Sequence, residues 1–178
     1  MKTCSFFGHR DTKATPELCE ELRKTVVRLI EEKGVKVFLF GSASKFDELS
    51  LKIVTDIKQE YTQITRVYVR AQYPHISEEY RNYLLQRYDD TIMPSGMDKA
   101  GKAGYVERNQ AMINASDFCV FYYDEKWQPP LRKRANKDLF AYQPKSGTRI
   151  AYEYAIQKKK EVINLCQKQD YEILKTRA

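Results

Sequence analysis

The stretch KTCSFFGHR, residues 2–10, decides the fold class of this chain. Four small or apolar residues, Cys4 to Phe7, run directly into Gly8, His9 and Arg10. A short apolar run of this kind is typical of a buried strand. A buried strand that ends in a glycine and two polar side chains is either a charged turn or the rim of a binding site.

Strand-like and helix-like segments alternate along the rest of the chain. We expect strands over 3–7, 35–40, 65–69, 91–94, 118–123 and 161–165, and helices over 16–33, 46–57, 77–88, 105–115 and 147–160. Strands separated by helices indicate βαβ units and a parallel sheet that is covered on both faces. The predicted fold class is therefore α/β, a single Rossmann-like three-layer domain over residues 1–178 with a mainly parallel sheet flanked by helices.

Two segments stand outside this alternation. Residues 124–146 are polar and contain Pro129, Pro130 and Pro144, so we expect a long loop or lid there. Residues 166–178 form a polar C-terminal tail.

The composition limits the partners. The chain of 178 residues carries 31 basic and 24 acidic residues, a net charge of +7, which indicates either an anionic partner or a solvated basic surface. No apolar run approaches the roughly 20 residues of a membrane span, and the N-terminus lacks a signal-peptide pattern. We expect a cytoplasmic protein without a membrane partner.

The cysteines do not indicate a metal site. Cys4, Cys19, Cys119 and Cys166 form no CxxC pair and have no histidine close by in the sequence. Cys4, Cys119 and Cys166 lie in apolar runs, and we interpret them as small buried hydrophobic residues. We predict neither a metal nor a cofactor.

Short polar motifs follow the predicted strands or open the last helix. They are Gly8-His9-Arg10, Gly41-Ser42-Ala43-Ser44, Tyr122-Tyr123-Asp124 and Ser146-Gly147-Thr148. The C-terminal ends of parallel strands meet at one edge of the sheet, where open α/β sheets bind ligands. Small residues and helix N-termini suit a phosphate, so we predict an anion cradle there. Each motif alone is also consistent with a plain turn or a helix cap.

Several of these motifs resemble the SLOG superfamily, named for the DprA/Smf and LOG proteins, and in particular its small bacterial or phage DUF1273/YpsA-like branch. Residues 3–10 are similar to its "C-F-x-G-H-R" start, and residues 38–47 partly follow its "F-x-G-G-A-x-G-x-D" segment. The motif "Y-x-x-R-N-x-x-M-[IV]-x-x-S-D" is matched at Tyr105, Arg108, Asn109, Met112, Ile113, Ser116 and Asp117. The "G-G-T" helix start corresponds to Ser146-Gly147-Thr148.

The resemblance implies a Rossmann-like domain that binds a nucleotide or nucleotide-derived ligand, such as an ADP-ribose-like molecule or a nucleoside phosphate. The implied ligand-binding residues are Gly8, His9, Arg10, Gly41, Ser42, Asp47, Arg108, Asn109, Ser146, Gly147 and Thr148. Asp47 is either an acceptor for a ribose hydroxyl or a helix N-terminal charge. The family also implies a homo-oligomer, because its members often pair through helices.

Two further functions stay open. A LOG-like phosphoribohydrolase or a deoxyribosyltransferase-like enzyme needs a carboxylate. The candidates are Asp47, Glu107, Asp124 and Glu153, of which we select Glu153 and Asp47. The LOG motif "P-G-G-x-G-T-x-x-E" places an acid about three residues past its threonine, whereas Glu153 lies five residues past Thr148. Two extra helical residues rotate a side chain by roughly 200°, so Glu153 would point in another direction. The third function is single-stranded nucleic-acid binding of the DprA kind. The net charge, the 13 tyrosines and a loop with Trp127 and basic residues 132–134 would suit it.

Overall fold

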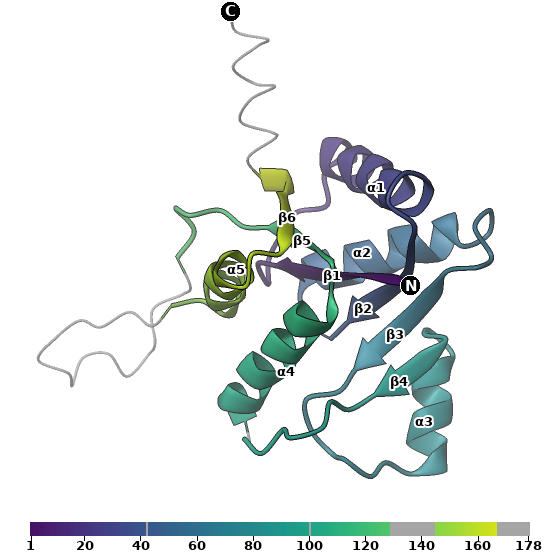
Figure 1. Cartoon of the computed structure of the whole chain (residues 1–178), viewed down its shortest axis with the longest axis vertical. Helices are drawn as coiled ribbons and strands as arrows, with labels where there is room; N and C mark the ends of the chain where they lie inside the picture. Colours follow the sequence, from purple (N-terminus) through teal and green to yellow (C-terminus); the bar gives the residue numbers. More distant parts are fainter. Residues whose placement is uncertain (42, 100, 129–144, 167–178) are drawn as a thin grey trace, which may run out of the picture.

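A six-stranded parallel sheet forms the centre of the molecule (Figure 1). The computed structural model describes residues 1–41, 43–99, 101–128 and 145–166. The strands are β1 (Lys2–Gly8), β2 (Val35–Phe40), β3 (Thr65–Val69), β4 (Asp90–Ile92), β5 (Phe118–Tyr122) and β6 (Glu161–Asn164). Their order across the sheet is β4-β3-β2-β1-β5-β6, and every described neighbouring pair is parallel.

Helices cover both faces of this sheet (Figure 1). The helices α1 (Pro16–Glu31) and α2 (Lys45–Ile57) pack on one face, and α4 (Gly101–Ala115) and α5 (Gly147–Gln157) pack on the other. The short helix α3 (Glu78–Leu85) lies beside β4 at the edge of the sheet. Serine or threonine side chains cap the N-termini of α1, α2, α3 and α5, each accepting a backbone N–H of the first turn.

The alternation of β1 side chains divides the core in two. Phe6 packs with Phe38 and Phe40 beneath α1 and α2, at ring separations of 6.0 and 5.2 Å. Phe7 points to the other face and stacks on Phe121 at 5.0 Å, beneath α4 and α5. Because both faces of β1 are buried, the strand needs a helical layer on each side.

The predicted fold class is confirmed, and the predicted strands and helices are all present. The clearest boundary error concerns α4, which begins at Gly101, four residues before the predicted start. Gly104 lies in this extra turn, where a Cβ would lie 2.5 Å from the Lys99 carbonyl oxygen. The close backbone contact takes place only in the folded chain. The helix α5 ends at Gln157, and Lys159 adopts a left-handed backbone with φ 54°.

Cys4 and Cys119 are buried as predicted, whereas the prediction for Cys166 is wrong. Cys166 lies just past the end of β6 and is half-buried, because the sheet no longer covers it there. Most of the predicted lid, residues 129–144, and nearly all of the predicted tail, residues 167–178, lie outside the described residues. Within the described ranges, no helix combines the length and apolar character needed to span a membrane.

Gly8 permits the contact between β1 and α2, so Gly8→Ala is expected to destabilise the fold. The added Cβ would lie 2.4 Å from Cβ and Cγ of Phe46, a fully buried side chain. Overpacking of this kind costs about 1–3 kcal/mol of unfolding free energy, measurable by urea denaturation. Gly147→Ala is the control, because nothing lies within 4 Å of its added Cβ. Equal stability of the two variants would contradict the packing role of Gly8.

Asp89 joins β3 to the start of β4. Its carboxylate accepts the backbone N–H of Arg66 at 2.7 Å and the Arg66 guanidinium at 3.1 and 3.0 Å, and it lies 3.2 Å from Nζ of Lys58. Burial raises the pKa of Asp89, but the hydrogen bonds from Arg66 and Lys58 outweigh burial and lower this pKa to about 2.

We expect Asp89→Asn to lower the unfolding free energy at pH 7 by about 1–2 kcal/mol, after allowing for solvent screening. The folded-state pKa lies below the unfolded value of about 3.9. The stabilisation is therefore fully present above the unfolded pKa and is lost as the pH falls toward the folded value. Urea denaturation at pH 7 and pH 3 should show the difference between wild type and variant shrinking, while the exposed Asp98→Asn control shows little difference at either pH. An equal difference in unfolding free energy between wild type and Asp89→Asn at both pH values would refute the stabilising role of the Asp89 carboxylate.

Candidate functional site

The parallel sheet brings the loops after β1, β2 and β5 to one edge. Gly8 and His9 end β1, Gly41 follows β2, and Tyr122 to Asp124 follow β5. The backbone N–H of Lys45 donates to the Arg10 carbonyl at 3.0 Å, which ties the first loop to the start of α2. This edge includes the point where the chain reverses its direction across the sheet, between β1 and β5.

His9 is buried under the loop that follows β5. Its Nε2 accepts the backbone N–H of Asp124 at 3.0 Å, and the Trp127 indole stacks on the imidazole at 4.3 Å between ring centroids. Trp127 Nε1 donates to Asp11 Oδ1 at 3.1 Å. Burial lowers the pKa of His9, with the Asp124 interactions opposing it, so the neutral imidazole is favoured. His9 and Trp127 thus contact each other at this corner.

Arg108 reaches from α4 across the edge to the end of β2. It is only 4% exposed; Nη1 donates to the Gly41 carbonyl, and Nε donates to Asn109 Oδ1 at 3.2 Å. Burial lowers the pKa of Arg108, while the negative charge of Asp47 acts in the opposite direction. A Cβ on Gly41 would lie 2.7 Å from Cδ of Arg108, so this glycine makes room for the arginine.

Asp47 lies in the first turn of α2 and is 2% exposed. Its backbone N–H donates to the Ser44 Oγ at 3.1 Å, the N-cap interaction of the helix. A carboxylate is favourable at a helix N-terminus, where the macrodipole is positive. The start of α2 therefore already carries a negative charge, which would repel a phosphate placed beside it.

The start of α5 lies at the same edge, because α5 runs back to the beginning of β6. Ser146 caps the helix through the Arg149 N–H, Gly147 is exposed and Thr148 is half-buried. Glu153 is exposed and pairs with Lys145 at 2.7 Å and Arg149 at 2.9 Å.

The structure therefore places Gly8, His9, Arg10, Gly41 and Asp47 on adjoining loops and the start of α2. Arg108 reaches Gly41 from the middle of α4, with Asn109 beside it. The two candidate catalytic carboxylates are not together, because Asp47 and Glu153 belong to helices on opposite faces of the sheet. Ser42 lies outside the described residues.

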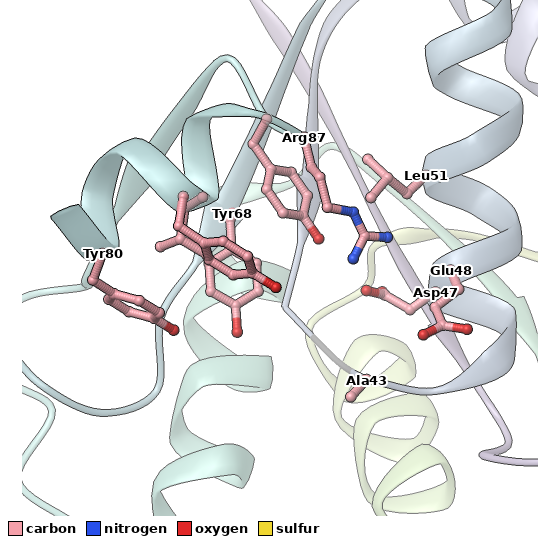
Figure 2. Close-up of a pocket in the computed structure, with 10 residues that line it drawn as sticks. Ala43, Asp47, Glu48, Leu51, Tyr68, Tyr80 and Arg87 are labelled. Atoms are coloured by element: carbon pink, nitrogen blue, oxygen red, sulfur yellow. The ribbon is translucent and has the colours of Figure 1, made fainter.

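A pocket of about 190 Å³ opens between α2 and α3 (Figure 2). Tyrosines form most of one wall, and two acidic residues of α2 lie in the opposite wall. The Arg87 guanidinium lies between these two walls. The residues that line it are Ala43, Asp47, Glu48, Leu51, Tyr68, Tyr80, Tyr83, Leu84, Arg87 and Tyr88. Of these lining residues, only Asp47 is among the site residues predicted from the sequence. The available signal was the spacing of Tyr80 and Tyr83, three residues apart and so on one side of a helix.

Tyr68 connects this pocket to Arg108. Its ring lies 5.1 Å from that of Tyr88. Burial raises the pKa of Tyr68, the Arg108 charge lowers it, and Tyr80, Asp47 and Tyr105 raise it further. Arg108 also lies 5.5 Å from the centre of the Tyr105 ring, a cation–π contact. Ala43 and Asp47 line the pocket and also lie at or just before the start of α2, so the tyrosine pocket adjoins the segment that follows β2.

Comparison with known proteins gives a fold and no family assignment. No family model matches the sequence, and no curated protein matches it. Among solved structures, DNA processing protein A (DprA) from Streptococcus pneumoniae has a TM-score of 0.54 and 13% identity, covering 91% of this chain and 49% of that one. DprA from Helicobacter pylori, described for its single-stranded DNA binding mode, has a TM-score of 0.54 and 15% identity, covering 90% and 63%.

The chain thus spans less than two thirds of the length of either DprA protein. At such low identity the likeness concerns the backbone alone. The protein has a Rossmann-like α/β fold similar to that found in DNA processing protein A.

Proposed function

We propose that this protein binds single-stranded nucleic acid along the C-terminal edge of its sheet, with bases stacked on exposed tyrosines. The observation that carries the proposal is the pair Tyr80 and Tyr83 on α3. Their rings are stacked at 6.2 Å, and they stand at the pocket wall with 42% and 58% of their surfaces exposed. Stacking on aromatic side chains is the usual way in which unpaired bases are held.

Two more exposed tyrosines belong to the same part of the molecule. Tyr73, 68% exposed, follows β3, and Tyr105, 47% exposed, lies in the first turns of α4. Large aromatic surfaces are normally buried on folding, because their removal from water is favourable. Exposed rings gathered on elements that adjoin one pocket therefore indicate a surface that a planar partner covers.

The charge distribution is compatible with a polyanion. Lys102 is exposed at the start of α4, and Arg87 lies at the pocket. Residues 129–144 and 167–178, outside the described structure, contain seven basic and three acidic residues, so part of the net charge of +7 lies there. Binding to phosphates should accordingly weaken with salt, through release of counterions.

The similarity to DprA adds support from a separate direction. The Helicobacter pylori protein is described as binding single-stranded DNA, and most of the present chain superposes on part of it. At 15% identity this similarity supports the fold rather than any shared residue. The proposal for this chain therefore rests on its own exposed tyrosines.

The nucleotide-ligand and N-glycosidase hypotheses have less support from the geometry. A free nucleotide with its phosphate at the start of α2 would meet the Asp47 carboxylate there. A glycosidase mechanism with both predicted acids is disfavoured, since Glu153 is engaged with Lys145 and Arg149 on the opposite face. The cytoplasmic location and the homo-oligomer stay predictions.

Tyr83→Ala should weaken binding of a fluorescently labelled oligo-dT by about tenfold at constant salt, because loss of one stacked base costs about 1–3 kcal/mol. Fluorescence anisotropy gives the affinity, and urea denaturation should show near-unchanged stability because Tyr83 is exposed. Tyr83→Phe should retain the affinity, since stacking needs the ring and not the hydroxyl.

Tyr61→Ala is the matched control. Tyr61 lies at the opposite edge of the sheet, where it packs against the core and bonds to Glu31, so its loss should reduce stability and leave oligonucleotide binding intact. The proposal is wrong if oligo-dT fails to bind at low salt, or if Tyr83→Ala and Tyr61→Ala weaken binding equally.

A further inference from the structure

We infer that the pocket between α2 and α3 accepts a single guanine base from the bound strand. The inference rests on the proposed function and names the base that the strand would present. It follows from three features of the pocket: its size, its aromatic wall and the pattern of hydrogen-bonding groups opposite that wall.

The size suits one base. The pocket measures about 190 Å³, below the lower end, about 300 Å³, of sites that enclose drug-sized ligands. Tyr80 and Tyr83 at the wall are exposed and can take a planar ring entering from solvent. Tyr68 and Tyr88 lie deeper, and the Tyr88 ring packs on Phe40 at 6.0 Å, which fixes the inner end of the aromatic wall.

The acidic wall selects the edge of the base. Asp47 and Glu48 come from the first turn of α2, opposite the tyrosines (Figure 2). An ionised carboxylate only accepts hydrogen bonds, so the base must present donors to it. Guanine has two adjacent donors, N1–H and the N2 amino group. Thymine offers one N–H between two carbonyl oxygens, and in adenine and cytosine the amino group lies beside a ring acceptor.

Glu48 is the better placed of the two acids. Its side chain is exposed at the pocket and can adjust to a ligand, whereas Asp47 is buried close to Arg108. We therefore assign the bidentate contact with N1–H and the N2 amino group to Glu48. Asp47 contributes negative potential behind it, which disfavours a phosphate or a carbonyl oxygen at the same position.

Arg87 complements the remaining edge of guanine. Its guanidinium lies in the pocket between the tyrosine wall and the acids of α2 (Figure 2). Arginine recognises the adjacent O6 and N7 acceptors of guanine through two parallel donors. A base that places N1–H and N2 toward Glu48 presents O6 on the neighbouring side. Glu48 thus supplies acceptors for N1–H and the N2 amino group, and Arg87 supplies donors for O6 and N7. Guanine is the only common base that matches both side chains.

The test uses modified bases, so that it does not depend on a variant that could misfold. Labelled oligo-dT strands of one length carry a single central residue: thymine, adenine, guanine, hypoxanthine or 7-deazaguanine. We expect guanine to bind about tenfold more tightly than thymine, the size of a good bidentate base contact. Hypoxanthine lacks the N2 amino group and should lose most of this gain, and 7-deazaguanine lacks N7 and should lose part of it.

Glu48→Gln should remove the guanine preference, so that the variant binds the guanine strand no more tightly than it binds pure oligo-dT. Glu60→Gln, an exposed acid just beyond the other end of α2, is the matched control and should keep the preference. Equal affinity for all five strands, or a guanine preference that survives Glu48→Gln, would overturn the inference and leave the proposed function intact. Binding of free guanosine that depends on Glu48, without binding of any oligonucleotide, would support the pocket and overturn the proposed function. A protein that binds neither would overturn both.

Discussion

The parallel pairing of β1 with a strand on each side is the constraint on which the rest of the molecule depends. β1 pairs with β2 and with β5, and its residues from Cys4 to Phe7 are buried. A strand with no exposed face must be covered twice, so helices follow on both sides of the sheet. Because all the neighbouring strands are parallel, each crossover returns the chain to the same end, and the C-terminal strand ends gather at one edge.

Close packing requires both glycines at that edge. Gly8 leaves space for Phe46 of α2, and Gly41 leaves space for the side chain of Arg108. Arg108 in turn donates to the Gly41 carbonyl and lies near Asp47 and Tyr68. A buried cation needs such partners to offset its desolvation, so these contacts make Arg108 part of the scaffold that positions the edge.

The chemical character of the site changes from one part of this edge to another. The corner at β1 and β5 is closed by Trp127 on His9. The corner at α2 and α3 presents exposed rings on one side and carboxylates on the other. Under the proposed function, the exposed rings would stack on bases, and the carboxylates would accept hydrogen bonds from the donor groups of one base. A single strand that crosses this edge would thus present its bases to this corner.

The sequence by itself determined the layers of the fold, since buried runs such as residues 35–40 and caps such as Ser146 are local patterns. It also indicated the edge where Gly8, His9 and Gly41 would meet. Only the tertiary structure decided that Tyr68, Tyr80 and Tyr83 share a pocket with Glu48, because β3, α3 and α2 converge through strand order and helix packing. A tyrosine looks the same in the sequence whether it is exposed or buried. Its solvent exposure is fixed only when the chain has folded.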